Sequence, residues 1–185
     1  MMNDPILILE NIEKHFGNMA ILRGISASVL EGSITAFVGP NGAGKTTLFH
    51  SITGDLRMDS GTVLFRGQSI GGKPPWKIAR LGLGKLFQDV RVFESLTVLE
   101  NVLLALHDHS GRSAVVSLLR APLHFHANGR QHAQAREWLE TAGVEQPYDR
   151  PAGQLSFGNK KLLALARLMA GKFNLLLLDE PTAGL

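Results

Sequence analysis

A glycine-rich segment that joins an apolar run to a predicted helix constrains this chain more than any other feature. Residues 39–46 read Gly-Pro-Asn-Gly-Ala-Gly-Lys-Thr and fit the pattern G-x-x-x-x-G-K-[ST]. The preceding run, Ile34–Val38, is apolar except for Thr35 and predicts a strand buried on both faces of a parallel sheet. Residues 45–53 predict a helix that ends near Gly54. We therefore expect an α/β protein with a phosphate-binding loop at a strand-to-helix corner.

The chemistry of this loop suits the phosphates of ATP. Its glycines let successive backbone N–H groups face one centre, and the helix N-terminus adds partial positive charge. Lys45 is expected to reach the outer phosphates, and Thr46 to offer its hydroxyl to Mg²⁺. A ligand-free glycine turn is the alternative, but chance matches rarely stand at such a junction. The predicted nucleotide-binding residues are Gly39, Pro40, Asn41, Gly42, Ala43, Gly44, Lys45, Thr46 and Thr47.

A second polar feature follows an apolar strand near the end of the sequence. Leu175–Leu178 is continuously apolar and leads into Asp179 and Glu180. Neighbouring strand residues point to opposite sides, so Asp179 is predicted to join the Mg²⁺ shell and Glu180 to polarise an attacking water as the catalytic base. Taken alone, the two acids would read as a solvated strand end. The phosphate loop favours the catalytic interpretation.

Composition limits the classes of partner. With 44% hydrophobic and 19% charged residues, the 185-residue chain is predicted to be globular. Its apolar runs are far shorter than the roughly 18 residues of a spanning helix, and we find no export signal. Lysines and arginines are scattered, with a net charge of +3, so we expect no nucleic-acid partner. Residence in the cytosol fits these features best.

Helical and strand-like segments alternate in blocks. Short strands are predicted in the first third, helices from about Thr97, at 97–106, 130–142 and 160–169, and a strand again at 173–179. We expect an ATP-binding core formed by 1–96 and 172–185, with a helical subdomain at 97–171. The sequence stops after the last strand without a following helix, so this core is expected to be incomplete at its C-terminus.

One further segment resembles a family. Leu155–Asn159 (Leu-Ser-Phe-Gly-Asn), ahead of the helix containing Arg167, resembles the signature motif of ABC ATPases. The order of motifs in that family is followed as far as Leu185. The resemblance implies a P-loop NTPase core with a mixed sheet and a helical signature subdomain. It implies that Phe16 stacks on adenine, and that Gln88 contacts magnesium and water and passes motion to a membrane partner.

The same resemblance implies an assembly. In the family, the signature of one subunit contacts the γ-phosphate held by another, so hydrolysis requires a dimer with a second ATPase subunit. Transmembrane permease subunits and, indirectly, a periplasmic or extracellular solute-binding protein are the other implied partners. The implied location is the cytoplasmic face of the membrane. The signature residues that correspond are Ser156, Phe157, Gly158 and Asn159.

The stretch between Gln88 and Ser156 resembles importer ATPases for branched-chain amino acids and related amides. Two departures from the family pattern stand out. Asn159 occupies a position where glutamine is usual, and residues 181–185 end inside the D-loop, without its aspartate or the histidine switch. Two alternatives therefore stay open: a nucleotide-binding fragment without hydrolysis, and a soluble ABC ATPase that acts on ribosomes or DNA.

Overall fold

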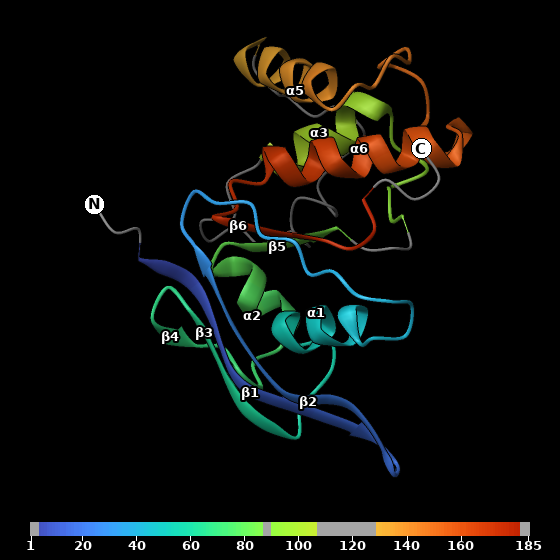
Figure 1. Cartoon of the computed structure of the whole chain (residues 1–185). Coiled ribbons are helices and arrows are strands. Elements are labelled where there is room, and N and C mark those ends of the chain that lie inside the picture. Colours follow the sequence, from blue (N-terminus) through green and yellow to red (C-terminus); the bar gives the residue numbers. More distant parts are fainter. Residues whose placement is uncertain (1–3, 87–89, 107–128, 182–185) are drawn as a thin grey trace. The chain divides into compact units, whose positions relative to one another are not determined.

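The computed structural model describes residues 4–86, 90–106 and 129–181 (Figure 1). The chain divides into two compact units, residues 1–83 and 84–185. Each unit has its own sheet and its own helices.

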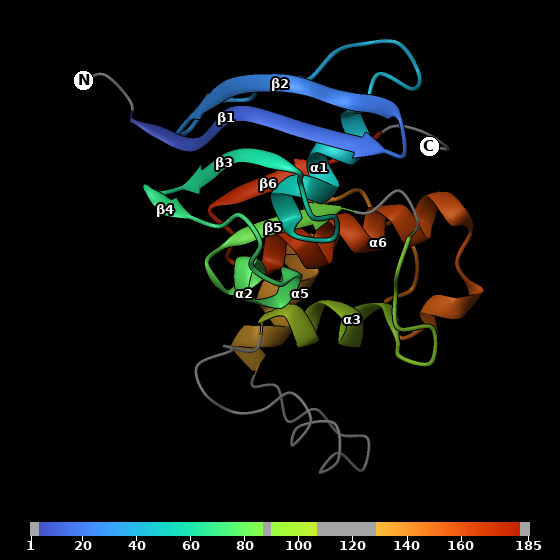
Figure 2. The ribbon, with the colours of Figure 1, turned by 90° about the horizontal axis from the view of Figure 1, so that it is seen from below.

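The first unit contains a four-stranded antiparallel sheet in the order β2-β1-β3-β4 (Figures 1 and 2). β1 and β2 form a long hairpin whose turn contains Gly17 at φ 59°, a left-handed conformation that glycine adopts without strain. β1 therefore lies in the middle of the sheet, paired with β2 on one side and β3 on the other. The strands span Pro5–Phe16 (β1), Met19–Leu30 (β2), Ser60–Phe65 (β3) and Gln68–Ser69 (β4).

Two helices lie on the same side of this sheet: α1 (Lys45–Thr53) and α2 (Pro75–Arg80) (Figure 1). α1 ends at Gly54, whose φ of 76° matches the predicted glycine stop. Apolar residues from the strands and both helices form the core of the unit. Its fully buried members include Leu7, Leu9, Ile12, Leu22, Ile52, Val63, Phe65, Ile70 and Ile78.

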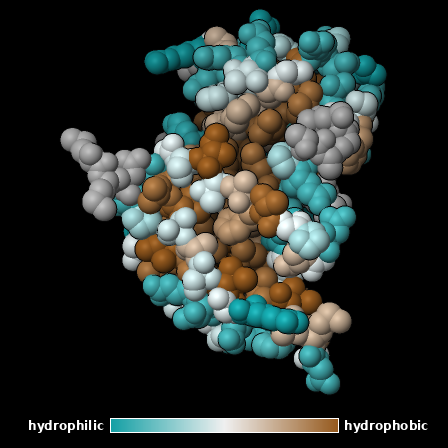
Figure 3. Space-filling model, in the orientation of Figure 1, coloured by the Kyte–Doolittle hydropathy of each residue, from teal (hydrophilic) through white to brown (hydrophobic). Residues whose placement is uncertain are grey.

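The predicted buried strand at Ile34–Val38 is wrong. These residues form no strand, and the side chains of Ile34 and Val38 are 102% and 93% exposed. Only Phe37 packs inward, edge-on to Phe49 with ring centroids 6.0 Å apart. An apolar run becomes a strand only where a neighbour accepts and donates its backbone hydrogen bonds, and no strand of the described residues pairs with this run. Figure 3 shows hydrophobic residues exposed on one face of the molecule.

The second unit is largely helical. Three helices among its described residues, α3, α5 and α6, pack against one another around a common apolar core. They span Val98–Leu106 (α3), Gly129–Thr141 (α5) and Phe157–Ala170 (α6), with a 3-10 turn at Ala152–Gln154. Two short strands, β5 (Leu83–Leu86) and β6 (Leu175–Leu178), form a separate sheet.

The predicted helices at 97–106, 130–142 and 160–169 are confirmed, with shifted ends. α6 begins three residues earlier than predicted because Ser156 caps it: its hydroxyl oxygen accepts a hydrogen bond from the N–H of Asn159 at 3.2 Å. Across the described ranges, none of the helices combines the length and apolarity needed to cross a bilayer.

Candidate functional site

The glycine-rich loop has the backbone geometry that an anion cradle requires. Gly42 and Gly44 have φ angles of 80° and 88°, in the left-handed region, and the N–H of Ala43 bonds to the carbonyl of Pro40 at 3.2 Å. A side chain at Gly44 would also crowd β2, since a Cβ there would lie 3.0 Å from the side chain of Leu22. Glycine at this position is thus required twice, by conformation and by space.

The N-terminus of α1 is open to a ligand. Its N-cap is Gly44, which has no side chain to bond the first helical N–H groups, and the first turn contains no acidic residue. These N–H groups and the helix dipole favour an anion. Thr46 and Thr47 in this turn are partly buried, whereas residues 40–43 are exposed. The loop and the first turn of α1 are therefore exposed or only partly buried.

Lys45 folds back over the loop. Its ammonium donates hydrogen bonds to the carbonyl oxygens of Gly39 (2.7 Å) and Pro40 (2.9 Å). Both acceptors are neutral backbone atoms. A phosphate oxygen would be a stronger, charged acceptor for the same ammonium group.

Phe16 is the last residue of β1, and its ring is 53% exposed. It pairs across the hairpin with Met19, two residues before Ile21, and a Cβ at Gly44 would lie 3.1 Å from the Ile21 side chain. Two strand residues correspond to about 7 Å along β2. The exposed ring and the glycine-rich loop are therefore neighbours within the first unit.

The acidic pair lies in the second unit, directly after β6. Asp179 is 4% exposed, whereas Glu180 is exposed, so the two carboxylates occupy different environments, as adjacent residues on opposite sides should. Glu180 has a φ of 48°, an uncommon conformation for a residue with a side chain. Its carbonyl oxygen accepts a 2.6 Å hydrogen bond from Lys161 on α6, which holds this turn in place.

The signature-like segment forms the N-terminus of α6. Ser156 and Phe157 are exposed, and Gly158 and Asn159 are partly buried. The Ser156 oxygen is engaged as a cap acceptor, but a hydroxyl also carries a proton that it can donate to an anion. Gln88 and residues 182–185 lie outside the described residues, so the predicted role of Gln88 stays a prediction.

Sequence reasoning missed the residues that hold segment 90–96, which follows Gln88. Asn101 is fully buried on α3 and accepts from the N–H of Phe93 at 2.9 Å. Its amide donates to the carbonyls of Phe93 (3.0 Å) and Thr97 (2.9 Å). The one available signal was an amide that follows Glu100 within an otherwise apolar stretch of α3.

Two cations of α6 bind the same segment. Lys160 forms a 2.7 Å ion pair with Glu94. Arg167 donates to the carbonyl of Arg91 at 2.6 Å, and its guanidinium lies 4.8 Å from the centre of the Phe93 ring. Burial lowers the pKa of Arg167 from its usual value. The helix that begins with the signature-like segment is therefore joined to residues 91–94, just after Gln88.

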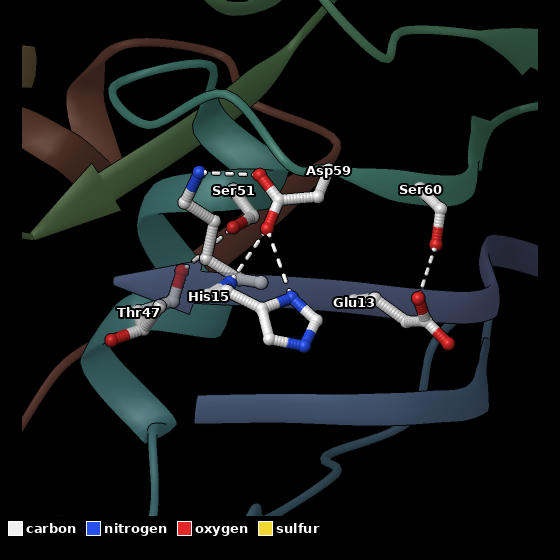
Figure 4. Close-up of polar contacts among 7 residues, drawn as sticks. Glu13, His15, Thr47, Ser51, Asp59 and Ser60 are labelled. Carbon is white, nitrogen blue, oxygen red and sulfur yellow. Dashed lines mark hydrogen bonds and ion pairs between the residues drawn. The ribbon is translucent and has the colours of Figure 1, made fainter. Parts of the chain in front are cut away.

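A group of polar residues where β1 ends and β3 begins was also missed. Asp59 bonds to Lys14 and His15, while Ser60 bonds to Glu13 (Figure 4). The hydrogen bond from Lys14, followed by that from the His15 backbone, lowers the pKa of Asp59 to about 2.

Comparison with known proteins identifies a family. Residues 22–183 match the family described as ABC transporter. The high-affinity branched-chain amino acid transport ATP-binding proteins BraF of Pseudomonas aeruginosa and LivG of Escherichia coli are both 36% identical over 184 residues, covering 100% of this chain and 72% of theirs. Two solved structures of an ATP-binding cassette from an ABC transporter, one of them nucleotide-free, superpose with TM-scores of 0.76 and 0.79. Each is 36% identical and covers 98% of this chain and 71% of its own.

Proposed function

Because the chain belongs to the ABC transporter family, we propose that it is the ATP-binding subunit of an importer for branched-chain amino acids or related amides. ATP hydrolysis coupled to transport is the activity of the family. The likeness to BraF and LivG, ATP-binding proteins of branched-chain amino acid transport, supports the substrate class. Substrate selection in such an importer belongs to the membrane and solute-binding partners.

The observation that carries this function is the loop at residues 39–46. Left-handed glycines, an open helix N-terminus and a lysine bonded to two neutral carbonyls make a site for the phosphates of ATP. On binding, the Lys45 ammonium exchanges the carbonyls of Gly39 and Pro40 for phosphate oxygens. Phe16 offers its exposed ring to the adenine.

The donor set suits magnesium. Thr46 contributes a hydroxyl and Asp179 a buried carboxylate, both hard oxygen donors of the kind that Mg²⁺ prefers. A buried carboxylate gains from a compensating cation, which Mg²⁺ supplies as it offsets phosphate charge. Gln88 is the third proposed contact. Glu180, exposed beside Asp179, is the proposed base that polarises the attacking water.

The proposed assembly is a head-to-tail dimer. In it, the N-terminus of α6, with Ser156–Asn159, faces the γ-phosphate held by a second subunit. We assign the ATP-binding core to 1–96 and 172–185, and the helical subdomain to 97–171. Permease subunits place the protein at the cytoplasmic face of the membrane, with a solute-binding protein as an indirect partner.

Thermal unfolding with and without ATP and Mg²⁺ tests the site. A ligand at a hundredfold excess over its Kd stabilises the folded state by about 2.7 kcal/mol, so the melting temperature should rise. Lys45→Ala should abolish this rise. Lys77→Ala is the matched control, because it removes an exposed lysine of α2 in the same unit and should leave the rise intact. An equal rise in wild type and Lys45→Ala would refute the assignment of this loop.

A further inference from the structure

Asp59, the residue before β3, binds the end of β1 through several contacts. Its Oδ1 accepts a 2.8 Å hydrogen bond from the Lys14 ammonium, and its Oδ2 accepts a 2.6 Å bond from the backbone N–H of His15. The His15 Nδ1 lies 3.2 Å from the same Oδ2 (Figure 4). The backbone N–H of Asp59 donates to the carbonyl of Glu13 at 2.9 Å. These contacts hold the carboxylate in one place beside β1.

Lys14 is restrained more than a surface lysine usually is. Its side chain is only 13% exposed, and its ammonium is bonded to a carboxylate whose pKa is lowered to about 2, so that this carboxylate stays ionised at neutral pH. A lysine side chain normally remains in solvent with free rotamers. Here one acceptor determines the position of the charge.

The restrained ammonium of Lys14 lies over Phe16. The Lys14 Nζ is 5.7 Å from the centre of the Phe16 ring, within the range of a cation–π contact. Residues two apart on a strand share a face of the sheet, which accounts for the approach of these two side chains. Phe16 nevertheless remains 53% exposed, and its cross-strand partner Met19 is 66% exposed. The ring is therefore held by Lys14 while much of its surface stays open.

We propose that Lys14 and Asp59 are positioning residues for the base of the nucleotide. Asp59 holds Lys14 against the Phe16 ring, and the ring in turn presents its open surface to adenine. Neither residue contacts the ligand. This inference rests on the proposed nucleotide site and adds the residues that orient its aromatic platform.

Comparing a ligand that has a base with one that has only phosphates distinguishes base recognition from phosphate recognition. Isothermal titration calorimetry would compare ATP with inorganic tripolyphosphate, both in Mg²⁺, on the whole chain. Lys14→Met keeps most of the stem and removes the charge, whereas Asp59→Asn keeps the shape and removes the anchor. Both should weaken ATP binding by about two- to fivefold, the effect of one exposed cation–π contact, and leave tripolyphosphate binding unchanged.

Two further variants control for folding and charge. Lys14→Arg keeps a cation and should restore ATP affinity, which a packing defect would not predict. Glu13→Gln alters a carboxylate between the same two strands, where the Ser60 hydroxyl donates to Glu13 at 2.9 Å, and should change neither affinity.

The outcomes are distinguishable. If the wild type binds neither ligand, the proposed function fails and this inference fails with it. If the wild type binds both, the inference is overturned when Lys14→Met binds ATP as well as the wild type does. It is equally overturned when Lys14→Met weakens the binding of ATP and of tripolyphosphate to the same extent. Lys14 and Asp59 would then only stabilise the fold.

Discussion

Asn101 is a polar residue whose side-chain amide bonds to one segment of backbone. It is 0% exposed, and it bonds to the N–H and the carbonyl of Phe93 and to the carbonyl of Thr97. A buried amide is tolerated only when such partners are present. The segment after Gln88 therefore has a defined path because of one side chain on α3.

Replacing Asn101 by alanine should lower the free energy of unfolding by about 1–3 kcal/mol, because the N–H of Phe93 loses its acceptor in a partly buried place. Urea unfolding followed by circular dichroism would measure the loss. A change below about 0.5 kcal/mol, the usual effect of a surface substitution, would contradict this role.

The lowered pKa of Asp59 predicts that the stability of the fold depends on pH. Its folded-state pKa of about 2 lies below the ordinary 3.8, so its contribution to stability is complete above about 3.8 and is lost as the pH falls towards 2. The difference in stability between wild type and Asp59→Asn should be largest at neutral pH and shrink across that acid range. Urea unfolding at a series of pH values would check it. A difference that stays constant would show that Lys14 and His15 do not stabilise the ionised form.

At the scale of elements, two helix ends are encoded by short sequence patterns. The end of α1 at Gly54 follows from a glycine after an amphipathic run. The start of α3 follows from a capping box: Thr97 N–H donates to Glu100 at 2.8 Å, and the N–H of Glu100 donates to the Thr97 hydroxyl at 3.1 Å. Both ends use contacts within a few residues of sequence, which is why pattern reasoning reaches them.

Gly54→Ala should destabilise the first unit by about 2 kcal/mol or more. Alanine at position 54 would have to keep a φ of 76°, and its Cβ would collide with the carbonyl oxygen of Lys73. Gly143→Ala, after α5, is the matched control: its φ is 78°, but no heavy atom of the described residues lies within 4 Å of the new Cβ. The control should lower the free energy of unfolding only by the cost of the left-handed backbone conformation, about 1 kcal/mol. Equal losses in urea unfolding would mean that the Lys73 carbonyl moves aside.

At the scale of the whole molecule, the residues proposed for ATP binding and hydrolysis belong to both units. The first unit contributes the loop at 39–46 and Phe16, and the second contributes Asp179, Glu180 and the N-terminus of α6. Within the second unit, Lys161 joins α6 to the turn at Glu180, and Arg167 joins the same helix to Arg91. A change in the position of α6 would therefore reach both the acidic pair and the segment after Gln88.

Glu180→Gln should separate binding from hydrolysis. The amide keeps the size of the side chain but cannot accept the proton of the attacking water, so phosphate release should fall by at least about a hundredfold while ATP affinity is retained. Glu137→Gln, an exposed substitution on α5, should match the wild type in both measurements. Normal phosphate release by Glu180→Gln would remove this residue as the catalytic base.

The sequence by itself determined the local features: a glycine-rich loop at the start of α1, an apolar strand before two acids, and a helix at the signature-like segment. Each depends on backbone conformations and periodicities within about ten residues. Contacts distant in sequence could not be predicted, as with Lys14 and Asp59, 45 positions apart, or Arg167 and Arg91, 76 apart. The error at Ile34–Val38 has the same origin. Apolar character favours burial, but register and the presence of a partner strand decide it, and both are properties of the tertiary structure.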